Sequence, residues 1–123
     1  MSRILVVDDE EGSRTVIEEF LRSNGYEVET FDAGPPALAA LESTAFDLIV
    51  LDIFLPGMDG IEILREVRKR RPKLPVIAIS GGGRQGSLSP LEAASRLGAN
   101  ATLPKPLEFE TFLSLVAELL AKK

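Results

Sequence analysis

Short apolar segments of strand length alternate along the chain with longer segments whose apolar residues recur at helical spacing. Residues 47–52 (DLIVLD) and 76–80 (VIAIS) are continuous apolar runs, which are typical of strands buried on both faces of a sheet. Residues 108–120 form an amphipathic pattern that predicts a helix. By the same criteria we expect strands at 3–7, 27–31, 47–52, 76–80 and 101–103, and helices at 11–24, 35–41, 61–70, 90–97 and 108–120.

Five strands that alternate with five helices predict an α/β fold in which helices cover both faces of a parallel sheet. Right-handed crossover connections restrict the arrangement to a few doubly wound topologies. The 123 residues contain no internal repeat and no linker. We therefore expect a single domain over residues 1–123.

Composition narrows the classes of function. The chain has no cysteine, which excludes disulfides and thiolate metal sites, and no histidine, which excludes an imidazole base and a phosphohistidine. A formal net charge of −5 argues against nonspecific binding to nucleic acid. No apolar run is long enough to cross a membrane, so we expect a cytoplasmic protein. One basic cluster is interpreted as the solvated last turn of a helix: Arg65, Arg68, Lys69, Arg70, Arg71 and Lys73.

Charged and hydroxyl side chains lie where the predicted strands end. They are Asp8 and Asp9, Asp52, Ser80 and Lys105, from four separate segments. In a doubly wound sheet, ligands bind outside the carboxyl ends of the strands, where the strand order reverses. Each residue alone has an ordinary explanation, such as a turn, a loop cap or a surface lysine, but all of them at one edge would require several coincidences. We therefore expect these side chains to converge on one crevice.

Four motifs, in their order and spacing, resemble the receiver domain of bacterial two-component response regulators over essentially the whole chain. They are VVDDE at 6–10, DLIVLDIFLPGMDG at 47–60, VIAISG at 76–81 and GANATLPKP at 98–106. The resemblance implies a doubly wound, flavodoxin-like parallel sheet of five strands in the order 2-1-3-4-5.

The resemblance also implies a phosphoacceptor switch rather than a turnover enzyme. Because the chain has no histidine, its phosphodonor must be another protein or a small molecule, and the resemblance implies a sensor histidine kinase or a phosphotransfer protein. We expect a stand-alone chain, a monomer or weak homodimer, that acts on a downstream protein and not directly on nucleic acid or a membrane.

Each residue of the crevice receives a role from the resemblance. Asp52 would be the phosphoacceptor, Ser80 would take the place of the switch hydroxyl, and Lys105 that of the invariant lysine, followed by a cis peptide bond to Pro106. A Mg²⁺ site is implied at four positions: Asp8, Asp9, Asp52 and the backbone carbonyl of Phe54.

The chemistry of the side chains agrees with these roles. Carboxylates crowded in one crevice need a cation, and hard oxygen ligands without histidine or cysteine suit Mg²⁺. A carboxylate can act as a nucleophile on phosphorus, and phosphoryl transfer mainly needs positioning and neutralisation of charge. The hydroxyl of Ser80 can donate a hydrogen bond to a phosphoryl oxygen.

Two other classes of protein remain open. A phosphatase of the haloacid dehalogenase type also has a nucleophilic aspartate at a strand end, but its second acid would lie two residues later, where this chain has Phe54. A flavodoxin-like flavin-binding protein could hold a phosphate with SGGGRQGS at 80–87, although a flexible loop is the simpler interpretation.

The chain departs from the receiver pattern at three places. Thr102 occupies the aromatic switch position, so no ring there can couple phosphorylation to output. Leu107 replaces the frequent phenylalanine after the Lys-Pro pair, which we expect to affect packing only. Gly81 opens a glycine-rich loop, and we expect phosphorylation to order residues 81–90 in part, more than the surroundings of Thr102.

Overall fold

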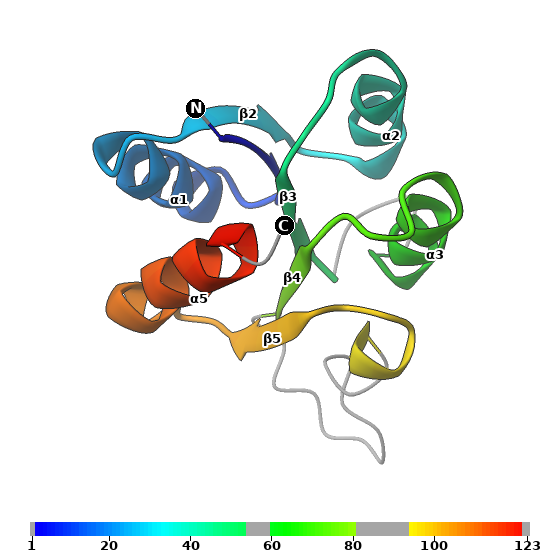
Figure 1. The fold of residues 1–123 in the computed structure, drawn as a ribbon. Helices are drawn as coiled ribbons and strands as arrows, with labels where there is room; N and C mark the ends of the chain where they lie inside the picture. The colour runs from blue at the N-terminus through cyan, green and yellow to red at the C-terminus, as the bar shows by residue number, and fades with distance from the viewer. Residues whose placement is uncertain (1, 54–59, 81–93, 122–123) are drawn as a thin grey trace.

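Five parallel strands form the centre of the molecule (Figure 1). The computed structural model describes residues 2–53, 60–80 and 94–121. The strands are β1 (Arg3–Val7), β2 (Glu27–Phe31), β3 (Leu48–Asp52), β4 (Val76–Ser80) and β5 (Ala101–Pro104). Their order across the sheet, β2-β1-β3-β4-β5, confirms the expected order 2-1-3-4-5.

Helices cover both faces of the sheet (Figure 1). One face carries α1 (Glu11–Ser23) and α5 (Phe109–Ala121), and the other carries α2 (Gly34–Ser43) and α3 (Gly60–Arg70). Residues 94–96 are helical, which agrees with the expected helix at 90–97 as far as the structure describes it. Among the described residues, no helix is long and apolar enough to span a membrane.

Alternation of side chains along β1 divides the core into two clusters. Leu5 and Val7 face α2 and α3, whereas Ile4 and Val6 face α1 and α5, and all four are buried. A shift of one residue in the register of β1 would exchange the two sets, so the core strongly specifies that register. The same register determines that Asp8 follows at the carboxyl edge of the sheet.

Two glycines permit tight geometry beside helix ends. Gly25 follows α1 with a φ of 91°, which bears out the helix stop expected from Asn24-Gly25. A Cβ on Gly60 would lie 2.4 Å from the Cα of Ile53, so glycine is required where α3 begins. The N–H of Gly60 also donates to the carbonyl of Ile53 at 3.0 Å. The start of α3 therefore lies directly against the residue that follows Asp52.

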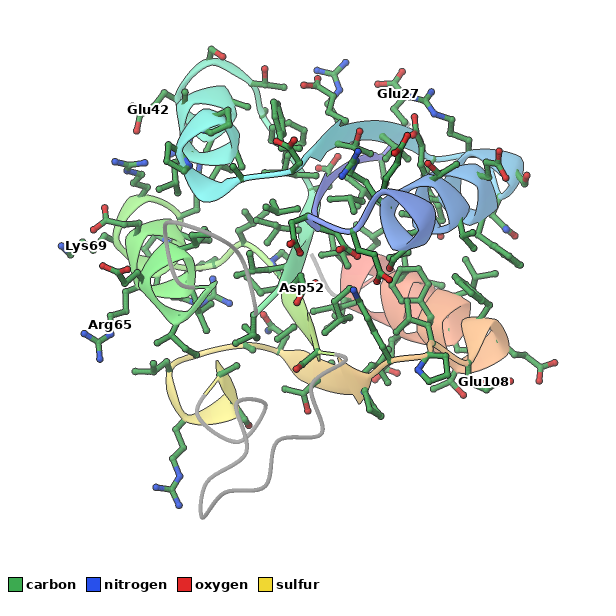
Figure 2. All side chains as sticks on the ribbon, turned by 180° about the vertical axis from the view of Figure 1, so that it is seen from behind. Glu27, Glu42, Asp52, Arg65, Lys69 and Glu108 are labelled. Carbon is green, nitrogen blue, oxygen red and sulfur yellow. The ribbon has the colours of Figure 1, made fainter. Side chains whose placement is uncertain are left out.

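The basic cluster at the end of α3 is only partly a solvated face. Arg65 and Lys69 point outward from the helix, as expected (Figure 2). Arg68 is half-buried, and its guanidinium donates to the carbonyl of Gly98 at 3.0 and 2.7 Å and to Oδ1 of Asn100 at 2.8 Å. The interpretation of Arg68 as a solvated residue is therefore wrong. Its acceptors are 30 and 32 residues distant, and a helical pattern alone does not reveal them.

Candidate functional site

The carboxyl ends of β1 and β3 bring acidic side chains together at one edge of the sheet. Asp8 follows β1 and is 0% exposed, and Asp52 ends β3 and is 3% exposed. Figure 2 shows Asp52 near the middle of the sheet edge. Asp9 is exposed, and one carboxylate oxygen from each of Asp8, Asp9 and Asp52 lies within 4.8 Å of the other two. The structure thus brings these three expected site residues together.

Lys105 joins two of these carboxylates. It follows β5, and its ammonium lies 3.0 Å from Oδ2 of Asp8 and 3.0 Å from Oδ2 of Asp52. A longer contact of 3.5 Å reaches Oε1 of Glu10. Burial lowers the pKa of Lys105, but hydrogen bonds to the two aspartates and their Coulombic attraction raise it by more, so its pKa lies above the usual value. Lys105 is therefore a positive charge at neutral pH that balances the buried carboxylates.

Backbone contacts place Lys105 beside Ser80. The N–H of Lys105 donates to the carbonyl oxygen of Ser80 at 2.9 Å, and the peptide bond between Lys105 and Pro106 is cis, as the resemblance implies. Ser80 ends β4, is 5% exposed, and lies at the same sheet edge as Asp52 because β3 and β4 are neighbours. The expected ligand Phe54 and the loop at 81–90 lie outside the described residues.

Asp8 has further partners that the sequence pattern did not predict. Its Oδ1 accepts the N–H of Glu10 at 3.0 Å, and its Oδ2 accepts the hydroxyl of Ser13 at 2.7 Å. Its backbone carbonyl accepts the guanidinium of Arg14 at 2.9 Å. All three donors come from the start of α1. In the sequence, the contact could have been suspected only from a hydroxyl residue five positions after the aspartate that follows a strand. The path of the chain from β1 into α1 shows that the hydroxyl of Ser13 points back at Asp8.

The cluster of carboxylates suits a small, hard divalent cation. Its three members offer oxygen ligands, and the whole chain contains no histidine or cysteine that would favour a softer metal. Mg²⁺ binds through carboxylates and keeps several waters, which the exposed side chain of Asp9 leaves room for. Asp8, Asp9 and Asp52 therefore fit Mg²⁺ by the chemistry of their donor atoms.

A groove of about 690 Å³ opens beside Lys105, between α1 and the segment that leads into α5. Its lining includes Glu10, Ser13, Val16, Lys105, Leu107 and Phe109. Val16 is 41% exposed, and the ring of Phe109 stacks on that of Phe20 with centroids 4.1 Å apart. The charged site therefore borders a surface that is largely apolar.

Two of the three departures from the receiver pattern lie on β5 and just after it, and the third, the loop that Gly81 opens, lies outside the described residues. Thr102 is half-buried and is paired with Ala78 of β4. Leu107 is partly buried and packs against the core cluster on the side of α1 and α5.

Comparisons with known proteins agree with this geometry. The profile of the response regulator receiver domain matches residues 4–117. The chain is 37% identical over 113 residues to the DNA-binding transcriptional regulator NtrC of Salmonella typhimurium, which covers 92% of this chain and 24% of that protein. The chain thus spans about a quarter of the length of this relative.

Solved structures share the fold over nearly the whole chain. A CheY-like receiver domain protein from Methanospirillum hungatei has a TM-score of 0.90 and 33% identity, over 99% of this chain and 95% of that one. The response regulator TrrA of Thermotoga maritima, in complex with Mg²⁺ and BeF, has a TM-score of 0.83 and 34% identity, over 97% of this chain and 99% of that one. These findings give no support to a phosphatase or a flavin-binding protein.

Proposed function

Because the chain belongs to the response regulator receiver domain family, it is a phosphoacceptor switch of two-component signalling, and we propose that Asp52 accepts the phosphoryl group. The observation that carries this assignment is the position of Asp52. It is a buried carboxylate at the end of β3, and its Oδ2 lies 3.0 Å from the ammonium of Lys105. Asp8, the other buried carboxylate among the described residues, receives hydrogen bonds from the start of α1 through both of its oxygens, which favours a ligand role for it.

In this reaction a carboxylate oxygen of Asp52 attacks the phosphorus of the donor. The new O–P bond forms as the bond from phosphorus to the donor atom breaks, and the leaving group keeps the electron pair. The donor atom is a phosphohistidine nitrogen in a protein donor or an acyl oxygen in acetyl phosphate. The phosphoryl group then remains on Asp52 until hydrolysis, so each chain takes up one equivalent and acts as a switch rather than a turnover enzyme.

Positive charge and hydrogen-bond donors around Asp52 would stabilise the transferred group. Asp8, Asp9 and Asp52, together with the carbonyl of Phe54, would hold Mg²⁺, which neutralises charge on the carboxylates and phosphoryl oxygens. Lys105 adds a second positive charge, and Ser80 donates a hydrogen bond to a phosphoryl oxygen. The solved structure of the similar response regulator TrrA is a complex with Mg²⁺ and BeF, which supports the proposal that this chain also binds Mg²⁺.

The assignment of Asp52 is tested with acetyl phosphate and Mg²⁺, followed by intact mass measurement. The wild-type protein should gain one phosphoryl group, and Asp52→Ala should gain none. Asp32→Ala is a matched control because Asp32 also follows a strand, β2, but is exposed. It should be phosphorylated like the wild type. Phosphorylation that persists in Asp52→Ala would contradict the assignment.

The groove beside Lys105 is the surface where we expect the protein donor to dock. A sensor histidine kinase or phosphotransfer protein must bring its phosphohistidine to Asp52, and the groove borders the site and presents Val16, which is 41% exposed. Val16→Asp should slow phosphotransfer from a protein donor at least tenfold and leave phosphorylation by acetyl phosphate unchanged. Ala39→Asp, an exposed position on α2, is the control. Equal slowing by both variants would mean that the donor docks elsewhere.

For output, these 123 residues would act through protein contacts. Their formal net charge of −5 gives little attraction to a phosphate backbone. The DNA-binding relative NtrC is about four times as long as the matched part, so its DNA binding need not lie in the shared domain. An electrophoretic mobility shift assay with the phosphorylated protein at physiological salt should show no specific complex, and a specific nanomolar complex would contradict this proposal.

A further inference from the structure

Ser13 takes no part in the proposed transfer, yet its hydroxyl donates to Oδ2 of Asp8 at 2.7 Å. The same oxygen is the one that Lys105 contacts at 3.0 Å. We infer that Ser13 is a positioning residue for the cation site: it orients the carboxylate of Asp8 and thereby sets the affinity of the protein for Mg²⁺. This inference rests on the proposed function, because it takes Asp8 to be a ligand of the cation.

Burial makes Asp8 dependent on donors from the protein. The residue is 0% exposed, so water does not reach it, and a buried carboxylate needs hydrogen bonds or positive charge to compensate for lost hydration. Three contacts supply them: the N–H of Glu10 on Oδ1, and both the Ser13 hydroxyl and the Lys105 ammonium on Oδ2. Both oxygens are therefore engaged, and Oδ2 is shared by two donors.

The two donors on Oδ2 differ in charge. Lys105 is positive, so it repels a cation, and it also contacts Asp52, where the phosphoryl group would arrive. Ser13 is neutral and is compatible with a cation beside Asp8. When the ammonium of Lys105 turns toward a phosphoryl group, Ser13 is the side chain that still orients Oδ2. Hydrogen bonds of this kind to metal ligands commonly change metal affinity 10- to 100-fold when they are removed.

The start of α1 holds Ser13 in place for this task. Ser13 lies in the first turn of the helix, and the next residue, Arg14, donates to the backbone carbonyl of Asp8 at 2.9 Å. The N-cap residue Glu10 makes no side-chain capping hydrogen bond, and its N–H instead donates to Asp8. Side-chain and backbone donors at this end of α1 are thus directed at one aspartate. The positive end of the helix dipole favours a carboxylate there as well.

The inference is tested by titration of Mg²⁺ into ¹⁵N-labelled protein without phosphodonor, followed through the amide signal of Glu10. That N–H donates to Asp8 and therefore reports on its carboxylate. Ser13→Ala should bind Mg²⁺ about tenfold more weakly than the wild type. Ser13→Thr keeps a hydroxyl at this position and should bind within about threefold of the wild type. Ser23→Ala makes the same chemical change at the far end of α1 and serves as the matched control.

The possible results separate this inference from the proposed function. If the wild type binds Mg²⁺ and Ser13→Ala binds it with the same affinity, Ser13 is not a positioning residue, even if the variant unfolds at a lower temperature. If Ser13→Thr is as weak as Ser13→Ala, the hydroxyl is not the cause and the inference is likewise wrong. If the wild type itself binds no Mg²⁺, the cation site proposed above is wrong, and the inference about Ser13 is then wrong as well.

Discussion

At the scale of single residues, Lys105 places its ammonium 3.0 Å from both Asp8 and Asp52, two of the three carboxylates that would hold a divalent cation. The lysine therefore competes with the cation while it balances the carboxylates. Removal of the ammonium of Lys105 would remove its Coulombic repulsion of the cation. For charges a few ångströms apart, this repulsion exceeds about 1.4 kcal/mol at an effective dielectric constant of ~20. We expect Lys105→Met to bind Mg²⁺ at least tenfold more tightly than the wild type, as measured by calorimetry. Weaker or unchanged binding would contradict this competition.

The contribution of charged Lys105 to the free energy of unfolding should depend on pH. Burial lowers its pKa, but the hydrogen bonds and the attraction of Asp52 and Asp8 raise it above the usual value of 10.5. A raised pKa in the folded state means that the stabilisation is fully present below pH 10.5 and is lost as the pH rises through the folded pKa. The difference in unfolding free energy between wild type and Lys105→Met should stay constant from neutral pH up to that point. It should shrink only in stronger alkali, as followed by urea unfolding at each pH.

The rule that strand ends meet at one sheet edge found Asp8, Asp52, Ser80 and Lys105 from the sequence, because it depends only on strand order and direction. It could not find Ser13. The hydrogen bond from Ser13 to Asp8 depends on the angle at which the chain leaves β1 and enters α1, and no spacing of residue types encodes that angle. The contribution of Phe54 lies outside the described residues and stays a prediction.

At the scale of elements, Arg68 connects the end of α3 to the segment before β5. Its guanidinium donates to the carbonyl of Gly98, to Oδ1 of Asn100 and to the carbonyl of Leu74. Hydrogen bonds that involve a charged group typically contribute about 1.5–3 kcal/mol. Arg68→Ala should therefore lower the free energy of unfolding by about 2 kcal/mol in chemical denaturation. Arg65→Ala, on the exposed face of the same helix, should change it by less than about 0.5 kcal/mol. Equal effects would mean that these contacts contribute little.

At the same scale, the side chain of Glu108 caps the start of α5. A carboxylate oxygen of Glu108 accepts the N–H of Thr111 at 2.8 Å and also its hydroxyl. The side-chain hydrogen bond first, and then the backbone one, hold the pKa of Glu108 below its usual 4.5. A lowered pKa in the folded state means that the stabilisation is present above pH 4.5 and is lost as the pH falls through the folded pKa.

Glu108→Ala should accordingly melt below the wild type at neutral pH, and the difference should disappear in acid. Glu110→Ala removes a charge from the first turn of the same helix and controls for the helix dipole. A difference between wild type and Glu108→Ala that persists unchanged into acid would mean that the cap does not act through the ionised carboxylate.

Element types followed closely from the sequence, because the continuous apolar run at 76–80 has the length of a buried strand and residues 108–120 follow helical spacing. Ends were less predictable. The helix expected at 35–41 extends over Gly34–Ser43, and the strand expected at 101–103 extends to Pro104. The one or two residues added at each end show no hydrophobic periodicity of their own. They continue an element whose central residues are already held by packing or by strand pairing.

At the scale of the whole molecule, the cation site couples to folding because it draws on residues from β1 and β3 together. A ligand that binds only the folded state stabilises it by mass action. At a Mg²⁺ concentration tenfold above the dissociation constant, the gain is about 1.4 kcal/mol. The melting temperature should then rise by roughly 4–8 °C in thermal scans at neutral pH. Asp8→Asn should abolish most of this shift, and an equal shift in that variant would argue for binding elsewhere.

The separation of Asp52 and Lys105 along the chain has a consequence for protein synthesis. Lys105 comes 53 residues after Asp52, and β5, which precedes it, must pair with β4 before its side chain reaches the site. A nascent chain whose Asp52 has already left the ribosome therefore still lacks the ammonium of Lys105 that contacts Asp52 in the folded protein. Prematurely terminated chains that lack β5 also lack Lys105, so a kinase should not phosphorylate them. Only chains translated beyond Lys105 should therefore take part in signalling.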